Sequence, residues 1–176
     1  MRKRFILLLA LLMVLSVAVA LPATAKEPLS GDVELYFNLG YDQATAPCPD
    51  ITWAGTVELD GVTYGMAFFP TDAKDVGKTH HFVEDWEIYD APYEFEGGVL
   101  TECIPGGIVL AGTDSGVTSP NSKYRMNGTV DEAFAPFAEW ADRKVHMSGD
   151  ITWEEIVLPD EVILVPATAP GTFRIN

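Results

Sequence analysis

The chain has 176 residues, and 26 Asp and Glu against 11 Lys and Arg give it a formal net charge of −15. Three of the basic residues and none of the acidic ones lie within the first 25 positions, so residues 26–176 carry eight basic and 26 acidic groups, a net charge of −18. This balance argues against a nucleic-acid partner and against anionic membrane surfaces, because both are bound by clustered Lys and Arg.

The N-terminal segment has the three parts of a secretory signal peptide. Arg2-Lys3-Arg4 is basic, the run from Phe5 to Ala20 is apolar apart from Ser16, and Ala23-Thr24-Ala25 matches an A-x-A cleavage site. The apolar run is short for a bilayer crossing. We therefore predict a signal peptide over residues 1–25, a secreted or extracytoplasmic protein with no membrane span after cleavage, and a single domain over residues 26–176.

The rest of the chain reads as strands separated by turns. Alternation of polar and apolar residues predicts strands from Gly31, Thr79, Lys123 and Lys144 onward, with shorter ones toward the C-terminus. The predicted strands, about nine or ten in all at the spacing of a sandwich or barrel, cover residues 31–39, 51–59, 62–69, 79–89, 98–103, 107–113, 123–130, 144–153, 161–165 and 172–175.

Two connections and one exception stand out among these elements. Asp60-Gly61 predicts a hairpin between residues 51–59 and 62–69, because this pair accepts the positive φ angles of a type I′ turn. Pro105-Gly106 suggests a second pair formed by residues 98–103 and 107–113. Residues 131–142 have a roughly helical apolar spacing that is interrupted by Pro136, so we expect a short helix or a packed loop there.

Two cysteines follow the leader, Cys48 and Cys103. An even pair in an exported protein indicates a disulfide, and the alternative is two separate thiols of which one or both are buried. The absence of a C-x-x-C motif argues against a redox role.

The densest group of chemically active side chains lies in the predicted strand at residues 79–89, which holds two of the three histidines. Adjacent residues of a strand point to opposite faces, so His80 and His81 do not share one metal ion without a bulge. We therefore predict no metal site, and the chain shows no cofactor-binding motif such as a glycine-rich phosphate loop.

The same alternation places Glu84 on the more apolar face of this strand, with Phe82 and Trp86. If that face lines a barrel, Glu84 is a carboxyl among aromatic rings, an environment that raises a carboxyl pKa and suits a proton donor or acceptor. The alternative is a structural ion pair, for which Arg125 is the candidate partner.

Several segments together resemble the allene oxide cyclase and dirigent type of barrel, and in particular its secreted bacterial members. The similarity covers roughly residues 50–152 and is carried by His80 to Ile88, Gly97-Gly98, Gly106-Gly107, Tyr124 to Ala133 and Phe137 to Gly149. It implies a single antiparallel barrel of about eight strands with a partly apolar interior. In characterised relatives it implies cyclisation or steering of reactive apolar intermediates without a cofactor.

These observations lead to three functional hypotheses. The first is an exported barrel that binds a small apolar molecule through Phe82, Trp86 and Met126, with Glu84 and Arg125 orienting it. The second is a cofactor-free cyclase or isomerase in which Glu84 is the acid or base. The third is a structural or interaction module with a closed core. The sequence leaves the ligand and the oligomeric state open.

Overall fold

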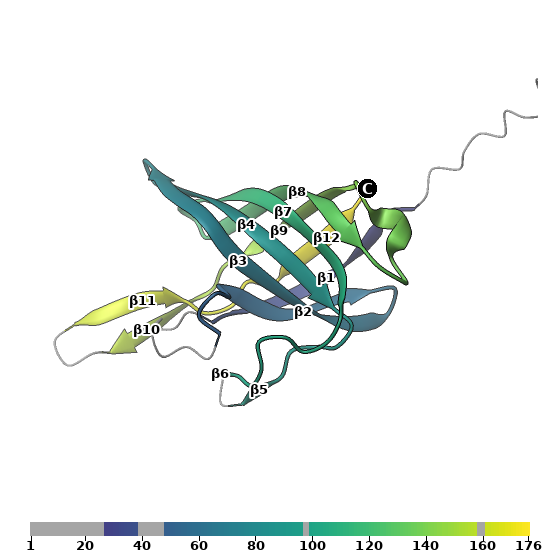
Figure 1. The fold of residues 1–176 in the computed structure, drawn as a ribbon. Coiled ribbons are helices and arrows are strands. Elements are labelled where there is room, and N and C mark those ends of the chain that lie inside the picture. Colours follow the sequence, from purple (N-terminus) through teal and green to yellow (C-terminus); the bar gives the residue numbers. More distant parts are fainter. Residues whose placement is uncertain (1–26, 39–47, 97–98, 158–160) are drawn as a thin grey trace, which may run out of the picture.

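The computed structural model describes residues 27–38, 48–96, 99–157 and 161–176. The predicted signal peptide lies outside these residues. Within these ranges the chain forms twelve strands and one short helix (Figure 1), in the order β1 (Leu29–Phe37), β2 (Trp53–Leu59), β3 (Val62–Val76), β4 (Thr79–Tyr89), β5 (Phe95–Glu96), β6 (Val99–Leu100), β7 (Ile108–Thr118), β8 (Lys123–Ala133), η1 (Ala138–Trp140), β9 (Lys144–Asp150), β10 (Trp153–Val157), β11 (Val162–Pro166) and β12 (Gly171–Ile175).

Eight of the strands form a closed barrel in which every neighbouring pair is antiparallel. The order around the barrel is β1-β12-β9-β8-β7-β4-β3-β2, and β1 closes it by pairing with both β12 and β2. The remaining strands form two small hairpins, β5-β6 and β10-β11. The prediction of an all-β, antiparallel barrel of about eight strands is confirmed. Closure pairs the strand edges that an open sheet would expose.

The hairpin predicted at Asp60-Gly61 is present between β2 and β3. Both turn residues have positive φ angles, 52° at Asp60 and 76° at Gly61, as a type I′ turn requires. β3 continues well past the predicted end at Phe69, because its extension to Val76 pairs with β4 across a second turn at Gly77.

The predicted pairing of residues 98–103 with residues 107–113 is wrong. β6 pairs with β5, and β7 lies between β4 and β8 in the barrel. The predicted strand at residues 144–153 is divided, because its last residue, Trp153, begins the separate hairpin β10-β11. The segment 131–142 contains the three-residue helix η1, in agreement with the short helix or packed loop expected there.

Apolar side chains pack in two places, inside the barrel and against its outer wall. The inner core includes Trp86, Leu110 and Phe173. The outer cluster covers the exterior of β2, β3 and β4 with residues from the β5-β6 segment, among them Tyr93 and Leu100. The predicted disulfide between Cys48 and Cys103, whose Cα atoms are 5.5 Å apart, ties this outer layer to the residues that precede β2.

The two ends of the barrel differ. Near η1, the buried side chains of Phe137 and Trp140 pack on the inner core, and Phe137 meets Tyr64 edge to face at 5.4 Å between ring centroids. At the opposite end, the long β3-β4 hairpin and the β10-β11 hairpin both extend away from the barrel (Figure 1). In the described part of the chain, no helix has the length and apolarity needed to cross a bilayer.

Candidate functional site

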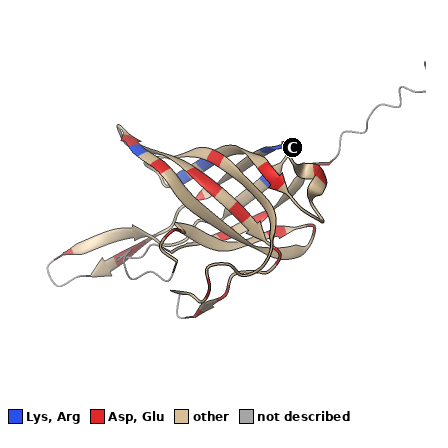
Figure 2. Ribbon diagram, in the orientation of Figure 1, with Lys and Arg blue, Asp and Glu red and all other residues tan. Residues whose placement is uncertain are grey.

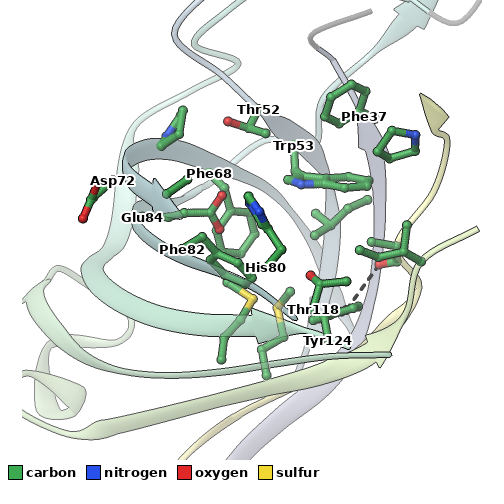
Figure 3. Close-up of a pocket in the computed structure, with 18 of the residues that line it drawn as sticks. Phe37, Thr52, Trp53, Phe68, Asp72, His80, Phe82, Glu84, Thr118 and Tyr124 are labelled. Carbon is green, nitrogen blue, oxygen red and sulfur yellow. Dashed lines mark hydrogen bonds between the residues drawn. The ribbon is translucent and has the colours of Figure 1, made fainter. Parts of the chain in front are cut away.

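A cavity of about 510 Å³ opens at the end of the barrel away from η1 (Figure 3). Its walls are mainly apolar and aromatic, and they come from barrel strands, from the segments between strands and from the projecting hairpin. The lining residues are Leu35, Phe37, Thr52, Trp53, Phe68, Pro70, Asp72, Ala73, His80, Phe82, Glu84, Thr118, Tyr124, Met126, Met147, Ile151, Trp153, Pro166 and Ala169.

β4 supplies the residues on which the sequence-based hypothesis depends. His80, Phe82 and Glu84 all line the cavity, as the alternation along the strand indicates. Met126 of β8 also lines it, so the structure brings together three of the five proposed site residues, namely Phe82, Glu84 and Met126.

Trp86 lies on the same inner face but does not line the cavity. Its side chain is 1% exposed and packs edge to face on Phe173 at 5.7 Å between ring centroids. Trp86 therefore belongs to the closed half of the interior, and the structure does not support its proposed direct contact with a ligand.

The proposed inward position of Arg125 is wrong. Arg125 is exposed, whereas its neighbours Tyr124 and Met126 are buried and line the cavity. Adjacent residues of a strand point to opposite faces, so the side of β8 that carries Met126 inward carries Arg125 outward. The expected pair between Arg125 and Glu84 is accordingly not formed.

Glu84 is left as a buried carboxyl without a cation. Its side chain is 6% exposed, and no hydrogen bond or ion pair to it is found among the described residues. Burial alone raises the pKa of Glu84 to about 7, because removing the carboxylate from water disfavours its charged form. Near neutral pH this group can donate a proton, accept one, or bind a cation.

A second buried acid, Asp114 of β7, lies directly opposite Glu84 in the β4-β7 ladder. It is 5% exposed, and its Oδ1 atom has no hydrogen-bond partner. Burial, followed by the neighbouring charges of Glu84 and Asp85, raises the pKa of Asp114 to about 8. Directly opposed residues of an antiparallel pair project from the same face of the sheet, so both carboxyls belong to the barrel interior.

Sequence reasoning missed Asp114 because it ended the strand at Thr113. The signal was present in the alternation of Leu110, Gly112, Asp114, Gly116 and Thr118, which is the inner face of β7 once the strand is extended to Thr118. Without knowledge that β7 pairs with β4, nothing marked this aspartate as the neighbour of Glu84.

Glycine in β7 makes room for the large side chains of β4. Gly116 lies opposite Phe82, and a Cβ there would stand 2.4 Å from the Cζ atom of the Phe82 ring. Such a distance is far inside van der Waals contact, so the ring lies over the backbone of β7. The position of this cavity wall therefore depends on glycine at residue 116.

The rim of the cavity is polar and partly charged. The Nδ1 atom of His80 is 2.9 Å from Oδ1 of Asp75, and both side chains are well exposed. Neither Lys nor Arg occurs among the lining residues. Asp and Glu are also more frequent than Lys and Arg along the strands of the barrel (Figure 2). Within the described ranges, no group of three or more His, Cys, Asp or Glu side chains is arranged to hold a metal ion.

Fold and site together define a closed antiparallel barrel with an apolar cavity at one end and a buried carboxyl in its wall. Comparisons with known protein families, with curated proteins and with solved structures found no match. The resemblance to the allene oxide cyclase and dirigent barrels stays a prediction.

Proposed function

We propose that this protein binds a small, largely apolar molecule inside its barrel. The observation that carries the proposal is the cavity of about 510 Å³, which falls within the size range of small-molecule sites. Such sites combine apolar walls with a few placed polar groups. Here aromatic rings and the two methionines Met126 and Met147 supply the walls, and Glu84 contributes a buried carboxyl to the lining.

We further propose that the protein works outside the cytoplasm. Two independent features support this: the signal-peptide pattern of residues 1–25 and the disulfide between Cys48 and Cys103. Disulfides persist in oxidising compartments and are rare in the cytosol. Mass determination of the protein recovered from the medium or periplasm of an expressing host tests this, with cleavage after Ala25 as the expected result.

A cavity-blocking substitution tests ligand binding. Thr118 lines the cavity from β7, so T118W places an indole inside it, whereas S115W places the same ring on the exposed outer face of that strand. We expect the fluorescence of phenylnaphthylamine, a neutral apolar probe, to rise on binding to wild type and S115W. The affinity of T118W should fall at least about tenfold. If wild type, T118W and S115W bound the probe equally well, the probe would bind at a site other than this cavity.

A second candidate function is a cofactor-free cyclase or isomerase in the same cavity. The specific observation in its favour is the carboxyl of Glu84, whose pKa of about 7 suits proton transfer at neutral pH. Once a substrate is known, turnover by E84Q is the test. A loss of about a hundredfold or more is expected from a general acid or base, and undiminished turnover would remove Glu84 from the mechanism.

We do not propose the third hypothesis, a module with a closed core. A filled interior would favour it, and the interior is filled around Trp86 but not beside Glu84.

A further inference from the structure

We propose that the ligand of this cavity carries a protonated amine, which binds the Glu84 carboxylate, and that Glu84 and Asp114 together select cations over neutral or anionic molecules of similar shape. This inference rests on the proposed function, because it assigns a chemical class to the molecule that the cavity binds.

The first argument is the carboxyl of Glu84 itself. A buried carboxylate is costly unless a cation or hydrogen-bond donors compensate it. The described residues supply neither to Glu84, since the lining contains no Lys or Arg and the expected partner Arg125 points outward. Glu84 nevertheless lines the cavity, so a molecule inside can reach it. A protonated amine supplies both a positive charge and hydrogen-bond donors.

The second argument is the position of Asp114. It lies opposite Glu84 across the β4-β7 ladder and is equally buried, but it does not itself line the cavity, so it acts on a ligand through its charge beside Glu84. Two neighbouring carboxyls in a poorly solvated site resist ionising together, and a cation beside them relieves that repulsion. A pair of this kind disfavours an anionic ligand more strongly than a single acid does.

The other titratable groups near Glu84 leave this preference in place. β3 presents Pro70 directly opposite Glu84 and Asp72 at the rim. β8 contributes Tyr124, whose pKa is raised, so it stays neutral. On β4 itself, His80 lies at the rim beside Asp75. None of these groups places a permanent positive charge next to Glu84.

The third argument concerns the walls. Phe68, Phe82, Trp53 and Tyr124 surround the space in front of Glu84 (Figure 3). Aromatic faces accept both apolar groups and cations, the latter through the negative potential of the ring. The best-matched class is therefore an amine attached to an aromatic or aliphatic body.

Matched probe series test the inference. Phenylpropylamine, phenylpropanol and phenylpropanoate share one body and differ in the charge of the end group, and decylamine, decanol and decanoate repeat the comparison with an aliphatic body. Isothermal titration calorimetry near pH 8 should rank amine above alcohol above carboxylate in at least one series. The amine should bind about tenfold or more tighter than the alcohol, as a charge-assisted hydrogen bond implies.

Two further measurements assign the preference to Glu84. In E84Q the amine should lose its advantage over the alcohol, while E58Q, which removes an exposed carboxylate from the outside of β2, should retain it. In the wild type, amine affinity should fall as the pH drops below about 7, by up to tenfold per pH unit, because protonation removes the carboxylate. The affinity of the alcohol should change little. The pH series needs no variant and stands even if E84Q does not fold.

The outcomes separate this inference from the proposed function. Equal affinity for amine and alcohol, tighter binding of the carboxylate, or an amine preference that survives in E84Q would overturn the amine assignment and leave a binding cavity. No binding of any probe in either series would overturn both.

Discussion

Gly112 lies directly opposite Trp86 across β4 and β7, and the indole ring occupies the space where a side chain at residue 112 would be. A Cβ on Gly112 would stand 2.6 Å from Cζ2 and 2.9 Å from Cε2 of Trp86, and 2.0 Å from the carbonyl oxygen of Thr129. Trp86 is the largest fully buried side chain in the barrel interior, so this contact helps to fill the closed half.

We expect G112A to destabilise the protein. The added methyl group meets backbone as well as the ring, so the strain cannot be relieved by one rotamer change, and overpacking of this kind costs about 1–3 kcal/mol. Urea denaturation measures the free energy of unfolding. G107A is the matched control, because a Cβ at residue 107 would stand 3.4 Å from its nearest neighbour, the Oδ2 atom of Asp90, which is ordinary van der Waals contact. Equal stability of the two variants would contradict the packing argument.

Stability should depend on pH through Glu84. Its pKa rises from an ordinary 4.5 to about 7 on folding, so the folded state holds a proton that the unfolded state has lost. The stabilisation is complete below about pH 4.5 and disappears as the pH rises through 7. E84Q, which stays neutral, should match wild type near pH 4 and exceed it by up to about 3 kcal/mol near pH 8.

Denaturation curves at several pH values check this prediction, with E58Q as the control for loss of an exposed charge. A constant difference in unfolding free energy between E84Q and wild type across that range would mean that Glu84 titrates normally in the folded protein. The pKa of Asp114 is about 8, so we expect D114N also to become more stable than wild type as the pH rises, with the difference still growing up to about pH 8.

Removal of the disulfide should destabilise the protein without opening the barrel. Cys48 and Cys103 are 55 residues apart, and closing a loop of that length contributes about 4 kcal/mol on the chain-entropy model. We expect the double variant C48A/C103A, and reduced wild type, to lose comparable stability in chemical denaturation. Because the bond lies with the outer cluster rather than in the cavity wall, probe binding should survive. If the variant without the disulfide no longer bound the probe, the disulfide would be needed for the cavity, contrary to this prediction.

Trp153 should anchor the projecting hairpin to the rim of the cavity. Its Nε1 atom donates a hydrogen bond to Oγ of Ser122 at 2.8 Å, and its ring lines the cavity although the side chain is 43% exposed. In W153A, amide hydrogen exchange should accelerate in β10 and β11 and remain unchanged in β8. E155A, an exposed position on β10, is the control. Unchanged exchange in the hairpin would mean that other contacts hold it.

The sequence alone determined the features that depend on neighbouring residues. Alternation along residues 79–89 assigned Phe82, Glu84 and Trp86 to one face, and Asp60-Gly61 marked the turn between β2 and β3. The two cysteines indicated the disulfide. Each of these features follows from backbone geometry or composition over a short stretch.

Only the tertiary structure decided how the faces of different strands combine. Arg125 and Met126 are adjacent on β8, so only one of them can face the cavity, and strand register together with barrel closure selected Met126. The same register placed Asp114 opposite Glu84, two residues that are 30 positions apart in the chain. The division of the interior into a filled half around Trp86 and an open half beside Glu84 depends on side-chain volumes from all eight strands, and alternation within one strand does not carry that information.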